Sequence, residues 1–250
     1  MLGRIATLIY GAFCYVVFFA TFLYAIGFID NLFVPKAMDS GRSGPLVEAL
    51  AIDAALLALF AIQHSVMARQ WFKRAWTAII PPAAERSTYV LFSSLALVVL
   101  FWQWRPIGGT IWQVDNPMGR VVILSFYVLG YAIVLVATFL INHFDLFGLR
   151  QTWMRFRSRA YTSIGFQTPG FYKLVRHPLY VGWLFVFWSA PTMTATHLVF
   201  SVATTAYILI AIRFEEKDLV ATLGDSYQRY REEVPMLVPH RVEASRLFKS

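Results

Sequence analysis

Two polar stretches near the end of the sequence contain residue types that could bind a charged small molecule. Arg176-His177-Pro178 comes directly before a long apolar run, and Glu215-Glu216 closes that run. Pro is favoured in the first turn of a helix, so the spacing predicts a helix that begins near Pro178 with two basic residues at its N-terminus. Such a helix end can hold an anion or a zwitterion. The alternative interpretation is a basic anchor at the membrane surface.

The apolar run over residues 179–212 is expected to bend, because as one helix it would be about 50 Å long and would exceed the thickness of a bilayer. Ser189-Ala190-Pro191 interrupts the run and predicts a helical hairpin with two arms. The hairpin would bring Glu215 back beside His177 and Tyr180. A basic end, a carboxylate and an aromatic ring suit an amino-acid zwitterion that carries a flat heterocycle. The alternative for the Glu pair is a solvated helix end.

Three polar side chains nearer the N-terminus are candidates for acid–base chemistry. His64 lies near the end of one apolar stretch, and His143 and Asp145 directly follow another. Imidazole and carboxylate groups can accept a proton from a nucleophile. Two His and one carboxylate are also a possible metal set, with ligands from different helices. The alternative is that these groups are polar links between helices, with Arg150 as a further partner.

The composition identifies an integral membrane protein. Of the 250 residues, 58% are hydrophobic and only 14% are charged, whereas an ordinary soluble domain has about 25% charged residues. The net charge of +8 does not require nucleic acid as a partner, since Lys and Arg gather in the cytoplasmic loops of membrane proteins. The single cysteine, Cys14, lies inside the first apolar stretch, so no internal disulfide is possible.

The predicted fold is all-α, with four transmembrane helices, a C-terminal helical hairpin and a cytoplasmic C-terminal tail, which gives five to six crossings. The four helices are expected over residues 5–29, 46–67, 87–104 and 118–141, and the tail from Arg213 onward. The loops after the second and fourth helices are basic, which predicts that these loops and both termini are cytoplasmic. The polar stretches at His64, His143, Arg176 and Glu215 are then expected at one membrane face.

The motifs around the hairpin resemble those of the isoprenylcysteine carboxyl methyltransferase superfamily. They comprise residues 176–182, Glu215-Glu216 with Leu219, Gly224, Tyr227, Tyr230 and Val234-Pro235. Members of this superfamily are membrane methyltransferases that take S-adenosylmethionine (SAM) from the cytoplasmic side. The SAM-binding residues that the resemblance implies are Tyr172, Arg176, His177, Pro178, Leu179, Tyr180, Gly182, Glu215 and Glu216. Ala211 stands where prenylcysteine enzymes have a substrate-contacting Arg, which argues against a prenylated-protein substrate.

Residues 19–28, 63–69, 85–89 and 142–150 resemble the NnrU-like membrane family and, within it, the bacterial methanethiol S-methyltransferases. This resemblance implies methyl transfer from SAM to methanethiol, which gives dimethyl sulfide, in a multi-pass protein of the bacterial cytoplasmic membrane. It also implies that residues 1–150 form the substrate side and residues 151–250 the SAM-binding region.

A thiol acceptor requires a base or a cationic environment, because thiolate rather than thiol is the nucleophile. His64, His143 and Asp145 are the expected candidates for this catalytic role. Two alternatives remain open at this point. One is a SAM-dependent methyltransferase that acts on another thiol, an amine or a phospholipid. The other is a non-enzymatic membrane permease or assembly factor, although no inverted repeat typical of transporters is visible in the sequence.

Overall fold

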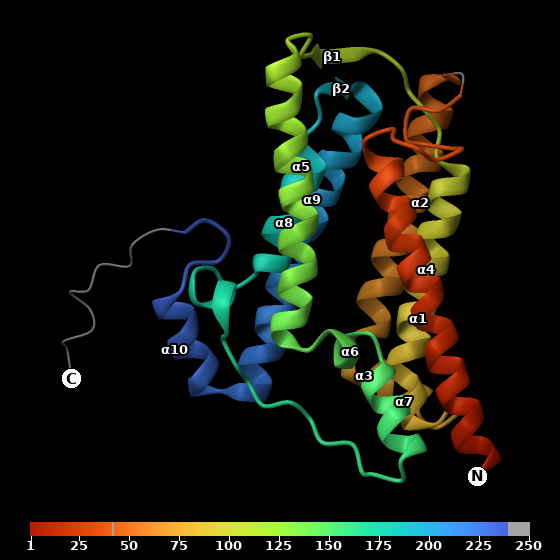
Figure 1. Ribbon diagram of the computed structural model, residues 1–250, viewed down its shortest axis with the longest axis vertical. Helices are drawn as coiled ribbons and strands as arrows, with labels where there is room; N and C mark the ends of the chain where they lie inside the picture. Colours follow the sequence, from red (N-terminus) through yellow and green to blue (C-terminus); the bar gives the residue numbers. More distant parts are fainter. Residues whose placement is uncertain (42, 240–250) are drawn as a thin grey trace.

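The computed structural model describes residues 1–41 and 43–239 and confirms an all-α integral membrane architecture (Figure 1). Residues 240–250 of the predicted tail lie outside the described residues. Among the described residues, five helices are long and apolar enough to cross a membrane. They are α1 (Leu2–Ile29), α2 (Leu46–Met67), α4 (Pro82–Gln103), α5 (Pro117–Ile141) and α9 (Ala195–Leu223).

Shorter elements complete the chain. The short helices are α3 (Gln70–Trp76), α6 (His143–Leu146), α7 (Leu149–Phe156), the 3-10 helix η1 (Gly170–Lys173), α8 (Pro178–Trp188) and α10 (Asp225–Glu233). Two strands that the sequence did not predict, β1 (Thr110–Gln113) and β2 (Thr192–Thr194), form an antiparallel ribbon. Helix α4 begins before its predicted start at residue 87, because Pro82 occupies its first turn.

The C-terminal helical hairpin forms as predicted, with α8 and α9 as its arms. Helix α8 begins at Pro178 and ends before Ser189-Ala190-Pro191. The hydroxyl of Thr194 then accepts a hydrogen bond from the backbone N–H of His197 and so caps the start of α9. With 11 residues, α8 is about 16 Å long, which is too short to cross a bilayer by itself. Helix α9 continues beyond the predicted end at residue 212 and contains Glu215-Glu216.

The N-terminus lies at one end of the helix bundle, together with α3, α6, α7 and α10 (Figure 1). The β ribbon lies at the opposite end. His64 is in the last turn of α2 and His143 follows α5, while Arg176 precedes α8 and Glu215 is near the end of α9. The four polar stretches therefore share one end of the bundle, as the predicted topology requires.

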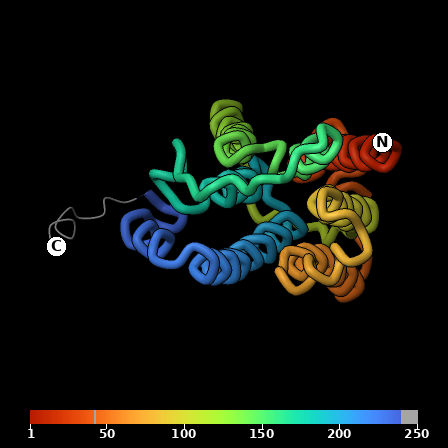
Figure 2. Tube along the Cα trace, turned by 90° about the horizontal axis from the view of Figure 1, so that it is seen from below, coloured from red at the N-terminus to blue at the C-terminus, as the bar shows by residue number. Residues whose placement is uncertain are grey.

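The long helices form two groups when the bundle is seen from the end that carries the N-terminus (Figure 2). In one group, α4 packs against both α1 and α2, and α7 packs against α1. In the other group, α5 packs along α8, while α9 contacts α8 and α10. Helix α5 lies before residue 150 in the chain but packs with the helices that follow it, so the two helix groups do not coincide with a division of the chain at residue 150. The assignment of a substrate side to residues 1–150 and a SAM-binding region to residues 151–250 stays a prediction.

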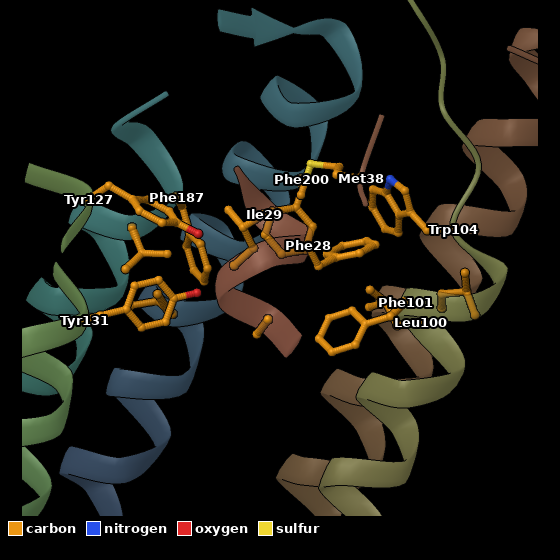
Figure 3. Close-up of a cluster of buried hydrophobic side chains, with 14 of the residues drawn as sticks. Phe28, Ile29, Met38, Leu100, Phe101, Trp104, Tyr127, Tyr131, Phe187 and Phe200 are labelled. Carbon is orange, nitrogen blue, oxygen red and sulfur yellow. The ribbon is translucent and has the colours of Figure 1, made fainter. Parts of the chain in front are cut away.

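A buried aromatic core joins the two helix groups (Figure 3). The ring of Phe28 in α1 lies 4.6 Å from that of Phe101 in α4 and 6.4 Å from that of Trp104, which directly follows α4. Trp104 packs edge-on against Phe200 of α9 at 5.5 Å, and Phe200 packs against Phe187 of α8 at 5.4 Å. These rings lie toward the β ribbon, so they anchor the hairpin at the end opposite the polar stretches.

Gly182 is the point of closest approach between α8 and α5. A Cβ atom at Gly182 would lie 2.7 Å from the carbonyl oxygen of Gly130 and 2.9 Å from the backbone nitrogen of Val134. Any larger side chain would therefore push the two helices apart. The structure shows a packing role for Gly182, and the SAM-binding role that the resemblance implied stays a prediction.

Asp53 is fully buried within α2 and contacts the chain beyond the end of α4. One of its carboxylate oxygens accepts a hydrogen bond from the backbone N–H of Arg105 at 2.9 Å. This bond satisfies a backbone donor at the end of the bundle that carries the β ribbon. Asp53 is therefore a structural link.

Candidate active site

Glu216 lies at the centre of a buried ion-pair network. Its Oε1 atom accepts hydrogen bonds from Arg176 Nε at 2.8 Å and from His177 Nε2 at 3.0 Å. Its Oε2 atom lies 3.3 Å from Arg231 Nε. The side chain is only 10% exposed. Because the protein itself supplies all of these partners, Glu216 holds the start of α8 against α9 and α10.

Glu215, the adjacent residue, has a different environment. Its side chain is 46% exposed, and its Oε2 atom accepts one hydrogen bond, from the hydroxyl of Tyr180 at 3.1 Å. The Nδ1 atom of His177 lies 3.9 Å from the same oxygen. Of the two carboxylates, Glu215 is therefore the one with capacity to bind an external cationic group.

The segment after α9 positions the basic residues and Tyr172. The backbone N–H groups of Arg176 and His177 donate to the carbonyls of Pro235 and Met236, at 2.8 and 3.2 Å. The hydroxyl of Tyr230 donates to the carbonyl of Tyr172 at 2.6 Å. The Tyr and Val-Pro motifs noted in the sequence therefore act through these backbone contacts.

The hydroxyls of Tyr172 and Tyr230 keep their protons in this arrangement because the pKa of each is raised. Burial raises the pKa of the Tyr172 hydroxyl, and the nearby charge of Glu215 raises it further. Burial raises the pKa of Tyr230 to about 12, against the opposing effect of Arg176. Tyr172, His177, Tyr180 and Glu215 together are called the Glu215 site below. Pro178 forms the first turn of α8 next to this site, and Leu179 follows it.

His64 lies in a hydrogen-bonded set with two residues of α4. Its Nε2 atom is 2.7 Å from the hydroxyl of Tyr89, and its Nδ1 atom is 3.1 Å from Ser93 Oγ. Ser93 donates its own proton to the carbonyl of Tyr89, so it accepts from His64 Nδ1–H. This assigns the lone pair of the imidazole to Nε2, which accepts from the Tyr89 hydroxyl.

Tyr207 of α9 lies beside His64. Its ring packs edge-on against that of Phe60 at 6.2 Å, and the ring of Phe60 stacks on that of His64 at 5.1 Å. Tyr207 also lies 3.3 Å from the hydroxyl of Ser65, next to His64. The structure thus brings α2, α4 and α9 together around His64.

His143 is a link between helices rather than a free base. Its Nδ1 and Nε2 atoms lie 2.8 Å from the hydroxyls of Thr138 and Tyr15. The ring stacks on Phe139 at 4.3 Å, and Phe147 lies 4.7 Å away. Burial lowers the pKa of His143. Since both ring nitrogens have partners, His143 joins α1 to the end of α5 as a neutral imidazole.

Asp145 is also engaged by the protein. Its carboxylate forms an ion pair with Arg150 at 2.8 Å and accepts a hydrogen bond from the hydroxyl of Tyr161 at 3.1 Å. These are the polar links that the alternative interpretation of the sequence described. The expected set of His64, His143 and Asp145 does not form, because the three side chains belong to separate networks. Across residues 1–41 and 43–239, no group of three His, Cys, Asp or Glu side chains is arranged to hold a metal ion.

Sequence reasoning missed Tyr89, Ser93 and Tyr207. Tyr89 lies in one of the recognised motifs, residues 85–89, but nothing in that motif shows that its hydroxyl meets His64 of another helix. Ser93 is one turn further along α4, and in the sequence nothing distinguishes it from other small residues of an apolar helix. Only the packing of α2 against α4 reveals their roles.

The fold defines a multi-pass all-α membrane protein, and polar side chains cluster at one end of its helix bundle. Comparison with known proteins identifies its relatives. The chain is 59% identical to a methanethiol S-methyltransferase of Crocosphaera subtropica over 95% of this chain and 93% of the relative. It is 52% identical to one of Mycobacterium tuberculosis over 94% and 97% of the two chains. The chain belongs to the methanethiol S-methyltransferase family and is therefore a membrane methyltransferase.

A more distant relative supports the wider resemblance of the C-terminal motifs. Nurim of Mus musculus is 30% identical over 70% of this chain and 69% of its own. This match fits the isoprenylcysteine carboxyl methyltransferase superfamily, as expected from the sequence. No protein-family model matches the chain. No solved structure matches it either.

Proposed function

We propose that the protein transfers the methyl group of SAM to methanethiol and releases dimethyl sulfide and S-adenosylhomocysteine. One structural observation carries the SAM part of the proposal: Glu215 is a half-exposed carboxylate with a single hydrogen bond, while Glu216 beside it is fully engaged. The thiol part is supported by the relatives that are named methanethiol S-methyltransferases.

The residues of the Glu215 site fit SAM by charge and shape. Glu215 would accept the α-ammonium group of the methionine moiety, because a charge-assisted hydrogen bond to an ammonium suits a carboxylate with free acceptor capacity. The rings of Tyr172 and Tyr180 would lie against the cationic or flat aromatic parts of the ligand. When bound, SAM supplies a methyl group on a positively charged sulfur. Arg176 and Glu216 would hold the start of α8 in place from behind the site.

His64 is the best placed of the three predicted bases. His143 has both ring nitrogens engaged and Asp145 is held by Arg150. His64 is instead bonded to the Tyr89 hydroxyl, and its neighbour Ser65 contacts Tyr207 of α9, the helix that carries Glu215. The thiol would donate its proton to the oxygen of Tyr89 as Tyr89 passes its own proton to His64 Nε2. The resulting thiolate is the nucleophile, and the sulfur–carbon bond to the methyl group forms as the bond to the donor sulfur breaks. The proton on His64 then returns to solvent.

We infer that the end of the bundle that carries the Glu215 site faces the cytoplasm of a bacterial inner membrane, with both termini on that side. The basic loop that contains α3 and the basic stretch after α6 both lie at this end, and basic loops favour the cytoplasmic side.

The assignment is tested with the Glu215→Ala variant of the purified protein. We expect SAM to bind at least tenfold more weakly, measured by calorimetry, because one charge-assisted contact is lost. Asp218→Asn removes a carboxylate from the same turn of α9 and serves as the matched control. Unchanged SAM affinity in Glu215→Ala would remove the assigned role. If SAM binds but no dimethyl sulfide forms from methanethiol, the acceptor is a different nucleophile; if SAM does not bind the unmodified protein, the enzyme proposal fails.

A further inference from the structure

A groove lined by three cations lies on the opposite face of α9 from Glu215. Arg213 and Lys217 stand one turn apart on α9, and Arg231 faces them from α10 across a cavity of about 310 Å³. Successive residues of a helix are rotated by about 100°, so Arg213 and Lys217 are each rotated by about 200° from Glu215. The groove is therefore separate from the Glu215 site.

Two of the three cations of the groove, Arg213 and Lys217, are not neutralised by neighbouring carboxylates, whereas Arg231 pairs with Glu216. Glu216, at the base of the groove, divides its charge between Arg231 and Arg176. Asp218, the next acidic residue, forms an ion pair with Arg69 of the loop after α2 at 2.7 Å. Within residues 1–41 and 43–239, no ion pair to Arg213 or Lys217 is formed. Two positive charges therefore remain for an external anion.

The groove also lies at the level where the apolar surface of α9 ends. Leu209 and Ile210 are 41% and 52% exposed, as expected for side chains that face lipid tails. After Ala211 and Ile212, residues 213–218 contain only charged residues and Phe214. A basic pocket at the end of a membrane helix is located where phosphate groups of lipids lie.

We propose that this groove binds the phosphate group of an anionic membrane lipid. The shared chemistry is a phosphate anion held by Arg213, Lys217 and Arg231, and the location favours a lipid headgroup over free phosphate. Guanidinium groups bind phosphate through paired N–H donors, and Lys adds a point charge. A bound phosphate would relieve the repulsion among the three cations and hold α10 against α9.

The groove is connected to the Glu215 site through Glu216. Arg231 contacts one oxygen of Glu216, and the other oxygen binds Arg176 and His177 at the start of α8. A lipid that holds Arg231 in place would therefore help to keep His177 beside Glu215. This connection rests on the proposed function, whereas lipid binding itself does not.

The test compares the full-length protein in vesicles of phosphatidylcholine alone, phosphatidylcholine with phosphatidylglycerol, and phosphatidylcholine with inorganic phosphate. We expect phosphatidylglycerol to raise the midpoint of thermal unfolding and to remain bound in native mass spectrometry. Arg213→Gln with Lys217→Gln should weaken this binding by more than tenfold, since each cation near an anionic surface contributes about a fivefold effect. Arg229→Gln, which removes an exposed charge from α10 outside the groove, should retain it.

Equal phosphatidylglycerol retention in the double variant and the unmodified protein would overturn the proposal. Equal losses in the Arg229→Gln control would also overturn it, because the effect would then be one of net charge. If inorganic phosphate reproduces the stabilisation and phosphatidylglycerol does not, the lipid assignment is wrong. These binding measurements do not depend on methyl transfer, so they remain decisive if the proposed reaction fails.

Discussion

Glu215 and Glu216 show how two adjacent and chemically identical residues take different roles. The sequence predicted that Glu215 lies beside His177 and Tyr180 across the hairpin. In the structure the Tyr180 hydroxyl donates to Glu215, and His177 Nδ1 lies 3.9 Å from the same carboxylate. The sequence alone could not predict which of the two carboxylates is buried. That depends on Arg231 and on the segment after α10, whose position against α8 is a matter of tertiary packing.

The two carboxylates are therefore expected to respond differently to the same substitution. Glu216→Gln leaves Arg176 without its buried partner and should lower the free energy of unfolding by about 3–5 kcal/mol. Glu215→Gln changes a half-exposed side chain and should alter the free energy of unfolding by no more than about 0.5 kcal/mol, while SAM binding weakens. Thermal unfolding in detergent measures both. Similar destabilisation by the two substitutions would contradict the assignment.

The proton path through Tyr89 leads to a second prediction for single residues. Tyr89→Phe removes the hydroxyl between the thiol and His64, so kcat should fall on the order of 10²–10⁴-fold. Ser93→Ala should lower kcat less, because it removes the acceptor that keeps the His64 proton on Nδ1 but leaves the base itself in place. SAM affinity should stay unchanged in both variants, as measured by calorimetry beside steady-state kinetics. Tyr10→Phe, which removes a tyrosine hydroxyl that bonds Thr88 of α4, is the control.

At the scale of elements, the lengths of the apolar stretches and the Pro positions predicted the long helices and the hairpin break. The short elements were not predicted, because they depend on contacts between distant parts of the chain. The β ribbon needs β1 and β2 from two different loops. The role of Gly182 likewise depends on α5, since only the packed helices show that its missing side chain admits the backbone of Gly130.

His143 joins α1 to the end of α5, and this link should depend on pH. Burial lowers the pKa of His143 below its usual value of 6.5, so the unfolded chain binds a proton at a higher pH than the folded protein does. The stabilising effect of neutral His143 is therefore complete above about pH 6.5 and is lost progressively as the pH falls below it. We expect the unfolding temperature to drop on acidification, and His143→Gln to show a smaller drop. Identical pH profiles for the two proteins would contradict this account.

At the scale of the whole molecule, the structure divides into two helix groups that meet through the aromatic core near the β ribbon. Composition alone predicted the membrane setting, and loop charges predicted that the polar stretches share one end of the bundle. The sequence could not predict that α5 packs against the hairpin, because the long helices are apolar on all sides and their sequences do not indicate which helix each one contacts.

The orientation of the bundle gives a prediction for the intact cell membrane. A reporter that is active only in the cytoplasm should be active when fused after Ser250, because α9 ends at the same end of the bundle as the N-terminus. The same reporter inserted at Gly109, beside β1 at the opposite end, should be inactive. Activity in the second position and not in the first would reverse the proposed orientation.

The central claim is that this chain moves a methyl group from SAM to methanethiol at the Glu215 site. The most direct measurement supplies SAM with a trideuterated methyl group, together with methanethiol, to the purified protein in vesicles and analyses the headspace by mass spectrometry. The account predicts dimethyl sulfide that carries one trideuterated methyl group, and a rate at least tenfold lower for Glu215→Ala at a SAM concentration near the Kd of the unmodified protein. Absence of the labelled product, or equal rates for the two proteins, would contradict it.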